Sequence, residues 1–239
     1  MKNQIIQKSL WLVGLFLLSC DSPLSDVEIT DPSLIQPVAV ISKTTDENGS
    51  VTKETIVTIY DKNLSTVELI NGSVLINNVE LDFVDYAFSG IYELDIPEFG
   101  LNQEYNLKII LSDGGAYVGT VTSQSIDLTD VNIPETHNKN EDLTISWGSC
   151  DVSSQLSITY NCNEDGSSSF GTIVDNISTE DKNEGEYIIS SSDLPGNDSC
   201  IESTIFSVVS VTEGTIDDSF RSGSIVKSKI RVSGECFWD

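Results

Sequence analysis

Basic residues are scarce in this 239-residue chain, which has 12 Lys and Arg against 38 Asp and Glu and a formal net charge of −26. Contacts to nucleic-acid phosphates need Lys and Arg, so the composition predicts no nucleic-acid partner. The same charge repels anionic membrane surfaces, so membrane attachment would have to come from a lipid. The acidity favours a well-solvated surface, with calcium binding as the alternative. The nearest approach to an EF-hand loop, residues 163–166, lacks the required spacing.

Residues and motifs that carry catalysis are also few. The single histidine, His137, lies in a polar connector, where a general base would need a pocket built around it. The chain has no G-x-S-x-G, H-E-x-x-H or Walker motif. Ser224 and Lys227 match S-x-x-K by letters, but alternation along a strand directs them to opposite faces. With so many acidic residues, carboxylate pairs arise by chance. We therefore predict a protein that is not an enzyme and needs no cofactor.

Long apolar runs are absent except near the N-terminus. There, Lys2 and Lys8 precede an apolar run over residues 10–18, which is typical of a secretory signal and short for a membrane span. The run ends in Leu17-Leu18-Ser19-Cys20, which resembles a bacterial lipobox. The resemblance implies that residues 1–19 are a signal peptide and that Cys20 carries the lipid that anchors the mature protein to the membrane.

The residues that follow Cys20 are rich in Asp, Ser and Pro and show little periodicity. We interpret residues 20–36 as a lipidated flexible tether. Acidic residues close to the lipid (Asp21, Asp26 and Glu28) resemble surface-export signals of Bacteroidota lipoproteins. The predicted location is therefore the outer membrane, with the protein facing either the surface or the periplasm.

Short alternating segments between turn signals fill the rest of the chain, and no sustained helical period follows the signal peptide. We predict an all-β protein with a first β-sandwich over 37–130, a linker over 131–142 and a second β-sandwich over 143–239. The first series of predicted strands is 38–42, 54–60, 79–84, 90–96, 105–111 and 116–122. The second series is 143–147, 156–160, 170–174, 186–190, 205–211 and 225–232.

The size and rhythm of each series resemble an immunoglobulin-like or fibronectin type III-like sandwich. Phe99-Gly100-Leu101 followed by Tyr105 resembles a tyrosine corner, in which the phenol bonds back to nearby backbone. The segment 143–147 resembles a fibronectin strand whose tryptophan, here Trp147, packs in the core. The chain resembles the tandem immunoglobulin-like lipoproteins of Bacteroidota, a group mostly of unassigned function.

Apart from Cys20, the cysteines all lie in the predicted second sandwich: Cys150, Cys162, Cys200 and Cys236. An exported protein permits disulfides, and four cysteines allow three connectivities. A fibronectin-like strand order implies Cys162–Cys200, which leaves Cys150 for Cys236 even though the same order places that pair at opposite ends of the domain. A four-thiolate zinc site is disfavoured because the cysteines are scattered without a C-x-x-C pair.

Basic residues are concentrated near the C-terminus, where Lys227, Lys229 and Arg231 alternate with apolar or small residues. This pattern fits an edge strand protected by charge, or a docking stripe for an anionic glycan or an acidic partner. The overall prediction is a lipid-anchored cell-envelope protein that acts as a non-enzymatic binding or structural module for an unknown protein or glycan. The alternatives are a glycan-binding accessory of a polysaccharide uptake system and a hydrolase on a β scaffold.

Overall fold

A computed structural model describes residues 28–86, 89–125, 128, 131–147, 154–164, 167–173, 185–194 and 201–239, with backbone alone for 154–164 and 167–173. The described residues form two short 3-10 helices, η1 (Pro32–Leu34) and η2 (Ser191–Asp193). All other regular secondary structure in this part of the chain is β-strand. The predicted all-β fold is therefore confirmed. The strands of the first half are β1 (Gln36–Thr45), β2 (Val51–Tyr60), β3 (Ser73–Ile76), β4 (Val79–Glu80), β5 (Asp82–Tyr86), β6 (Ser89–Asp95), β7 (Glu104–Ile110) and β8 (Ala116–Thr122).

The second half contributes the strands that complete these sheets. They are β9 (Thr136–His137), β10 (Leu143–Ser146), β11 (Ser154–Glu164), β12 (Ser167–Ile173), β13 (Glu186–Ile189), β14 (Ile201–Glu213), β15 (Thr215–Ile216) and β16 (Ile225–Trp238). The largest sheet in the described part of the chain has nine strands in the order β12-β11-β14-β16-β1-β2-β6-β5, with β9 paired to β16. A five-stranded sheet, β15-β8-β7-β3-β4, and a two-stranded sheet, β10-β13, complete the fold.

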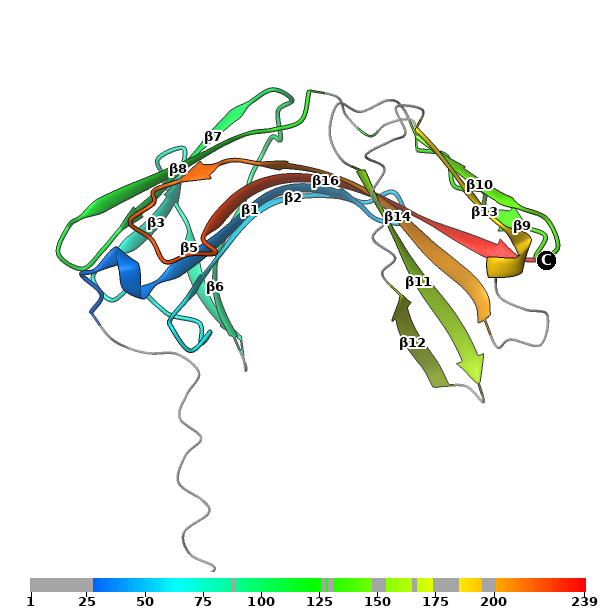
Figure 1. The fold of residues 1–239 in the computed structure, drawn as a ribbon, viewed down its shortest axis with the longest axis horizontal. Coiled ribbons are helices and arrows are strands. Elements are labelled where there is room, and N and C mark those ends of the chain that lie inside the picture. Colours follow the sequence, from blue (N-terminus) through cyan, green and yellow to red (C-terminus); the bar gives the residue numbers. More distant parts are fainter. Residues whose placement is uncertain are drawn as a thin grey trace, which may run out of the picture.

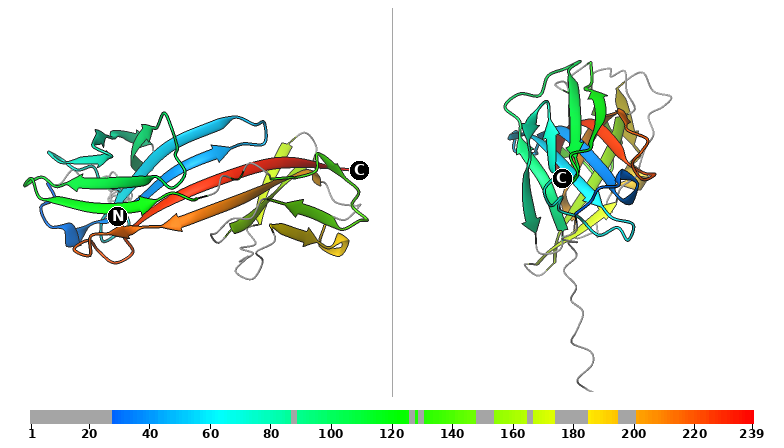
Figure 2. Two further views of the ribbon diagram at one scale, coloured as in Figure 1. Left: turned by 90° about the horizontal axis from the view of Figure 1, so that it is seen from above. Right: turned by 90° about the vertical axis from the view of Figure 1, so that its left-hand side faces the viewer.

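The nine-stranded sheet forms an arch (Figure 1). The five-stranded sheet lies over one end of the arch and the β10-β13 pair over the other, both on the convex side (Figure 1). Seen from above, β14 and β16 run along the longest axis of the molecule (Figure 2). The two sandwiches therefore share one continuous sheet.

The core of the first sandwich follows from alternation along its strands. On β7, Tyr105, Leu107 and Ile109 are buried, as the period of two predicts. They pack against Ala39 and Ile41 of β1, among other buried residues. Residues assigned to the tether also contribute: Ile29 and Ile35 are buried in this core, so only the part of the predicted tether before residue 28 lies outside the described chain.

The second core lies between the other end of the large sheet and the β10-β13 pair. Trp147 is 6% exposed and packs with Leu143, Ile145 and Phe206, as its predicted core position requires. Single strands supply both cores: on β16, Val226 belongs to the first and Ile230 to the second.

The boundary predicted at residue 143 does not separate the two sandwiches. Phe220 and Val226 lie in the first core, β15 pairs with β8, and β16 pairs in parallel with β1. The predicted linker is also part of the sheet, because Thr136 and His137 pair with the end of β16. The reason is that β14 and β16, which follow the other strands of the second sandwich in sequence, are long enough to extend back into the first.

Candidate functional site

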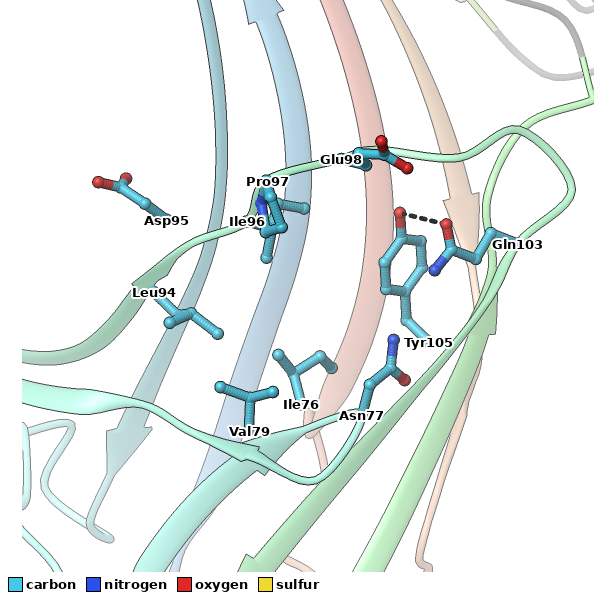
Figure 3. A pocket seen from close by; sticks show the side chains of 10 residues that line it. All are labelled: Ile76, Asn77, Val79, Leu94, Asp95, Ile96, Pro97, Glu98, Gln103 and Tyr105. Atoms are coloured by element: carbon cyan, nitrogen blue, oxygen red, sulfur yellow. Dashed lines mark hydrogen bonds between the residues drawn. The ribbon is translucent and has the colours of Figure 1, made fainter.

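A cleft of about 390 Å³ opens at one end of the first sandwich (Figure 3). It lies between the β3–β4 turn and the connection from β6 to β7. The lining residues are Ile76, Asn77, Val79, Leu94, Asp95, Ile96, Pro97, Glu98, Gln103 and Tyr105. Its volume is within the range of small-ligand sites, about 300–1,000 Å³.

Aliphatic side chains form most of the wall of this cleft. Ile76 is almost fully buried, whereas Val79 on the short edge strand β4 is 53% exposed and stands at the mouth. Leu94 and Ile96 pack against the first core and complete the wall. Apolar surface is therefore accessible to a ligand, and the side chains of the first core support it from behind.

Tyr105 lies at the inner side of the cleft and forms the predicted tyrosine corner. The Gly100 N–H donates to the Tyr105 hydroxyl at 3.1 Å, which confirms the predicted bond back to the backbone. The hydroxyl in turn donates to Gln103 Oε1 at 3.3 Å (Figure 3). Burial raises the pKa of Tyr105, so the phenol stays protonated and keeps this geometry at physiological pH.

Two carboxamides present their NH2 groups beside the Tyr105 ring. Asn77 Oδ1 accepts from the Asn106 N–H at 2.9 Å, and Gln103 Oε1 accepts from the Gly100 N–H at 3.1 Å. Because a backbone N–H requires an oxygen acceptor, these bonds fix the orientation of both amides. Asn77 Nδ2 and Gln103 Nε2 point toward the ring in Figure 3. The cleft thus offers two hydrogen-bond donors on an apolar background.

Acidic side chains outnumber basic ones around the cleft, where Lys53 Nζ donates to the Pro97 carbonyl at 3.3 Å. Asp95 and Glu98 are exposed at its rim, and none of the ten lining residues is basic. The Asp95 carboxylate points away from the interior in Figure 3. Such a rim disfavours anionic ligands and favours neutral ones that carry hydroxyl donors.

The predicted docking stripe lies elsewhere, on β16. This strand is paired on both sides, with β14 and with β1, so the interpretation as a charged edge strand is wrong. Lys227 forms an ion pair with Glu213 at 3.0 Å. Arg231 Nη2 donates to Ser207 Oγ at 2.9 Å.

The four cysteines of the second half have different outcomes. Cys236 is a buried free thiol in the second core, where it packs as a small apolar side chain, and this contradicts its predicted pairing with Cys150. Burial, with a smaller effect from Asp239, raises the pKa of Cys236 to about 11. Cys162 lies on β11 opposite Ile201 of β14. Cys150 and Cys200 lie outside the described residues, so the Cys162–Cys200 disulfide stays a prediction.

Cys20 and the predicted signal peptide, residues 1–19, lie outside the described residues. Within those residues, no helix is long and apolar enough to cross a membrane. His137 Nε2 lies 3.1 Å from the Glu141 carbonyl, and its ring meets the edge of Trp238 with centroids 6.3 Å apart.

Exposed aromatic side chains do not form a platform in the described part of the chain. Tyr86 and Phe237 are each about half exposed and lie at opposite ends of the molecule, on β5 and at the C-terminal end of β16 (Figure 1). Sequence reasoning missed the cleft altogether. The signals that accompany it are the Asn77-Asn78 turn and Gln103 beside the tyrosine corner.

No protein-family model and no curated protein matches this chain. Among solved structures, it is similar to the SGBP-B protein of the mixed-linkage glucan utilization locus of Bacteroides ovatus, in complex with a mixed-linkage heptasaccharide. The two share 17% sequence identity with a TM-score of 0.23. The match covers 90% of this chain and 47% of that chain, so this protein spans about half the length of the matched one.

Proposed function

We propose that the protein is a lipid-anchored, non-enzymatic envelope protein that binds a neutral glycan in the cleft of the first sandwich. The observation that carries this proposal is the pair of fixed amide donors, Asn77 Nδ2 and Gln103 Nε2, set on an aliphatic wall inside an acidic rim. The lipid on Cys20 would hold the cleft at the membrane that the export signal selects.

A neutral sugar has the chemistry that this cleft can satisfy. Its hydroxyl and ring oxygens accept from amide NH2 groups, its hydroxyl protons bond to carboxylates, and its C–H faces pack on aliphatic carbon. Asp95 and Glu98 are available as acceptors at the rim. An anionic sugar would meet those two carboxylates without a basic side chain among the lining residues, so neutral chains are favoured.

The first test places a charge on the apolar wall. Val79→Glu should lower the affinity for a bound neutral polysaccharide at least about tenfold, because the new carboxylate covers the wall beside Ile76. Isothermal titration of the mature protein against a panel of uncharged polysaccharides gives the measurement. Val118→Glu is the matched control: Val118 is also exposed, at 57% against 53%, and lies on β8 outside the cleft.

A second pair of variants tests one amide donor at positions where glycine can keep the backbone conformation. Asn77 and Asn78 both have positive φ, 50° and 67°, and only Asn77 lines the cleft. Asn77→Gly should weaken binding about three- to tenfold through loss of one donor, and Asn78→Gly should leave it unchanged. Absence of binding to every neutral polysaccharide would refute the proposal. Release of reducing sugar during the titration would show a hydrolase instead.

A further inference from the structure

The basic side chains of β16 lie on the open face of the nine-stranded sheet. Val226 and Ile230 face the two cores, so the alternating Lys227, Lys229 and Arg231 face the other way. The two smaller sheets cover the convex side of the arch in Figure 1, which places this open face on the concave side. Because β16 is central in the sheet, the three cations lie at the middle of the arch and do not protect an edge strand.

The three cations differ in how the protein neutralises them. Lys227 has Glu213 at 3.0 Å. Neither Lys229 nor Arg231 has a carboxylate within ion-pair distance among the described residues. These two neighbouring cations have like charge and lie on one face, and none of the acidic side chains that the structure describes lies within ion-pair distance of either.

The environment of these two side chains is unfavourable for charge as it stands. Among the described side chains, the buried Arg231 Nε has no hydrogen-bond partner, and Nη2 bonds to Ser207 Oγ. A buried donor left without a partner is rare and calls for an explanation such as an absent ligand. Burial and then the charge of Arg231 lower the pKa of Lys229, against an opposing effect of Glu54. An anion between the two side chains would offset the repulsion between their charges.

We propose that Lys229 and Arg231 form an anion site that takes the carboxylate of an acidic polysaccharide on the open face of the sheet. Arg231 suits a carboxylate because its planar guanidinium can donate two parallel hydrogen bonds, and Lys229 adds a second charge two residues away on the same face. Lys227 is not part of the site, because Glu213 already neutralises it.

Two part-exposed hydroxyl side chains close to the cations, Thr44 and Ser233, favour a sugar polymer over an acidic protein. In the β1–β16 register, Ser42 lies beside Lys229 and Thr44 beside Arg231. Ser42 and Ser207 are buried, whereas Ser233, whose Oγ lies 2.8 Å from Ser207 Oγ, is part-exposed beyond Arg231. A peptide could not add as a strand here, because β16 is already paired on both edges. The site does not depend on the proposed cleft, which is lined by different residues.

The experiment titrates the mature protein with oligogalacturonate, a polymer of uronic acid, at low salt. The double variant Lys229→Gln/Arg231→Gln should lower its affinity at least about tenfold, through loss of charge-assisted hydrogen bonds. The control, Lys227→Gln, removes one positive charge from the same strand and face and should stay within about twofold of the wild type, whereas Lys229→Gln and Arg231→Gln, each of which also removes one charge, should both weaken binding. Binding should also weaken as salt rises from about 50 mM to 500 mM.

A further variant keeps the test independent of folding. Thr44→Glu places a carboxylate beside Arg231 and should abolish oligogalacturonate binding without lowering the Tm. Three results would each overturn the proposal: equal loss in Lys227→Gln, equal or tighter binding of poly-L-glutamate, or no binding of oligogalacturonate. Val79→Glu should leave uronate binding intact. If it abolishes that binding, the acidic polymer uses the cleft, and the site on β16 is wrong.

Discussion

Two exposed loops of the first sandwich have the same bonding pattern around an aspartate. In one loop, Asp46 Oδ1 accepts from the N–H groups of Asn48 and Ser50. In the other, Asp61 Oδ1 accepts from the N–H groups of Asn63 and Ser65. The fourth position of each loop has a positive φ. It is Gly49 at 79° in one loop and Leu64 at 64° in the other.

Replacement of the leucine should stabilise the protein. A non-glycine residue in the left-handed region destabilises the fold by about 1–2 kcal/mol. Glycine avoids this strain but loses more backbone entropy on folding, which cancels only part of the gain. Because Leu64 is 64% exposed, little packing is lost. We expect Leu64→Gly to raise the free energy of unfolding by about 0.5–1 kcal/mol in urea titrations. Leu64→Ala keeps the strained φ and should give no gain. A gain equal to that of glycine would show that the side chain, and not φ, is responsible.

The buried phenol of Tyr92 gives the protein a specific alkaline limit. Its hydroxyl accepts from the Leu69 N–H at 2.6 Å, and burial raises the pKa of Tyr92 to about 12. The unfolded value is about 10, so the contribution of this proton to stability is complete below pH 10 and is lost as the pH rises toward 12. Wild-type stability should therefore fall across that interval.

Tyr92→Phe isolates this effect. The variant should be about 1–3 kcal/mol less stable at pH 7, because the Leu69 N–H loses its acceptor in a buried site. Between pH 10 and 12, however, its stability should fall less steeply than that of the wild type. Urea midpoints at pH 7, 10 and 11.5 give the comparison. Parallel loss in both proteins would show that Tyr92 does not titrate in this range.

At the scale of strands, local alternation predicted most of what the structure shows. The predicted segment 116–122 coincides with β8, and 105–111 differs from β7 by one residue at each end. The tyrosine corner was predictable because its partners, Gly100 and Tyr105, are close in sequence and the phenol has few places to bond. Trp147 was predictable because a large aromatic on the apolar face of a strand is most stable in a core.

Contacts between distant segments were not predictable in this way. The predicted strand 79–84 is divided at Leu81, because β4 pairs with β3 in one sheet and β5 pairs with β6 in another. Nothing in the alternation around Leu81 shows that change of sheet. The central place of β16 depends on β1, nearly 190 residues earlier in the chain. The candidate cleft was missed for the same reason, since Asn77 and Gln103 come from separate turns.

At the scale of the whole molecule, the two sandwiches are joined through their shared strands. Gln124 is 1% exposed and lies where the two cores meet. Its Nε2 donates to the Ser210 and Ser228 carbonyls, and its Oε1 accepts from Ser228 Oγ. These bonds attach the end of β8 to both β14 and β16. Phe99 packs against both cores. Because these contacts and the shared strands β14 and β16 link the two cores, we expect the two sandwiches to unfold together.

The tryptophans allow that expectation to be tested. Two of the three tryptophans, Trp147 and Trp238, lie in the described residues, and both report on the second core. Ile59 is fully buried in the first core, and Ile59→Ala should cost about 2–5 kcal/mol through the cavity that it leaves. If unfolding is a single transition, this change lowers the urea midpoint of tryptophan fluorescence as much as that of far-ultraviolet circular dichroism. Ile145→Ala in the second core should also shift both signals together. If Ile59→Ala leaves the fluorescence midpoint in place, the second sandwich is stable without the first, and β14 and β16 join two independent folding units.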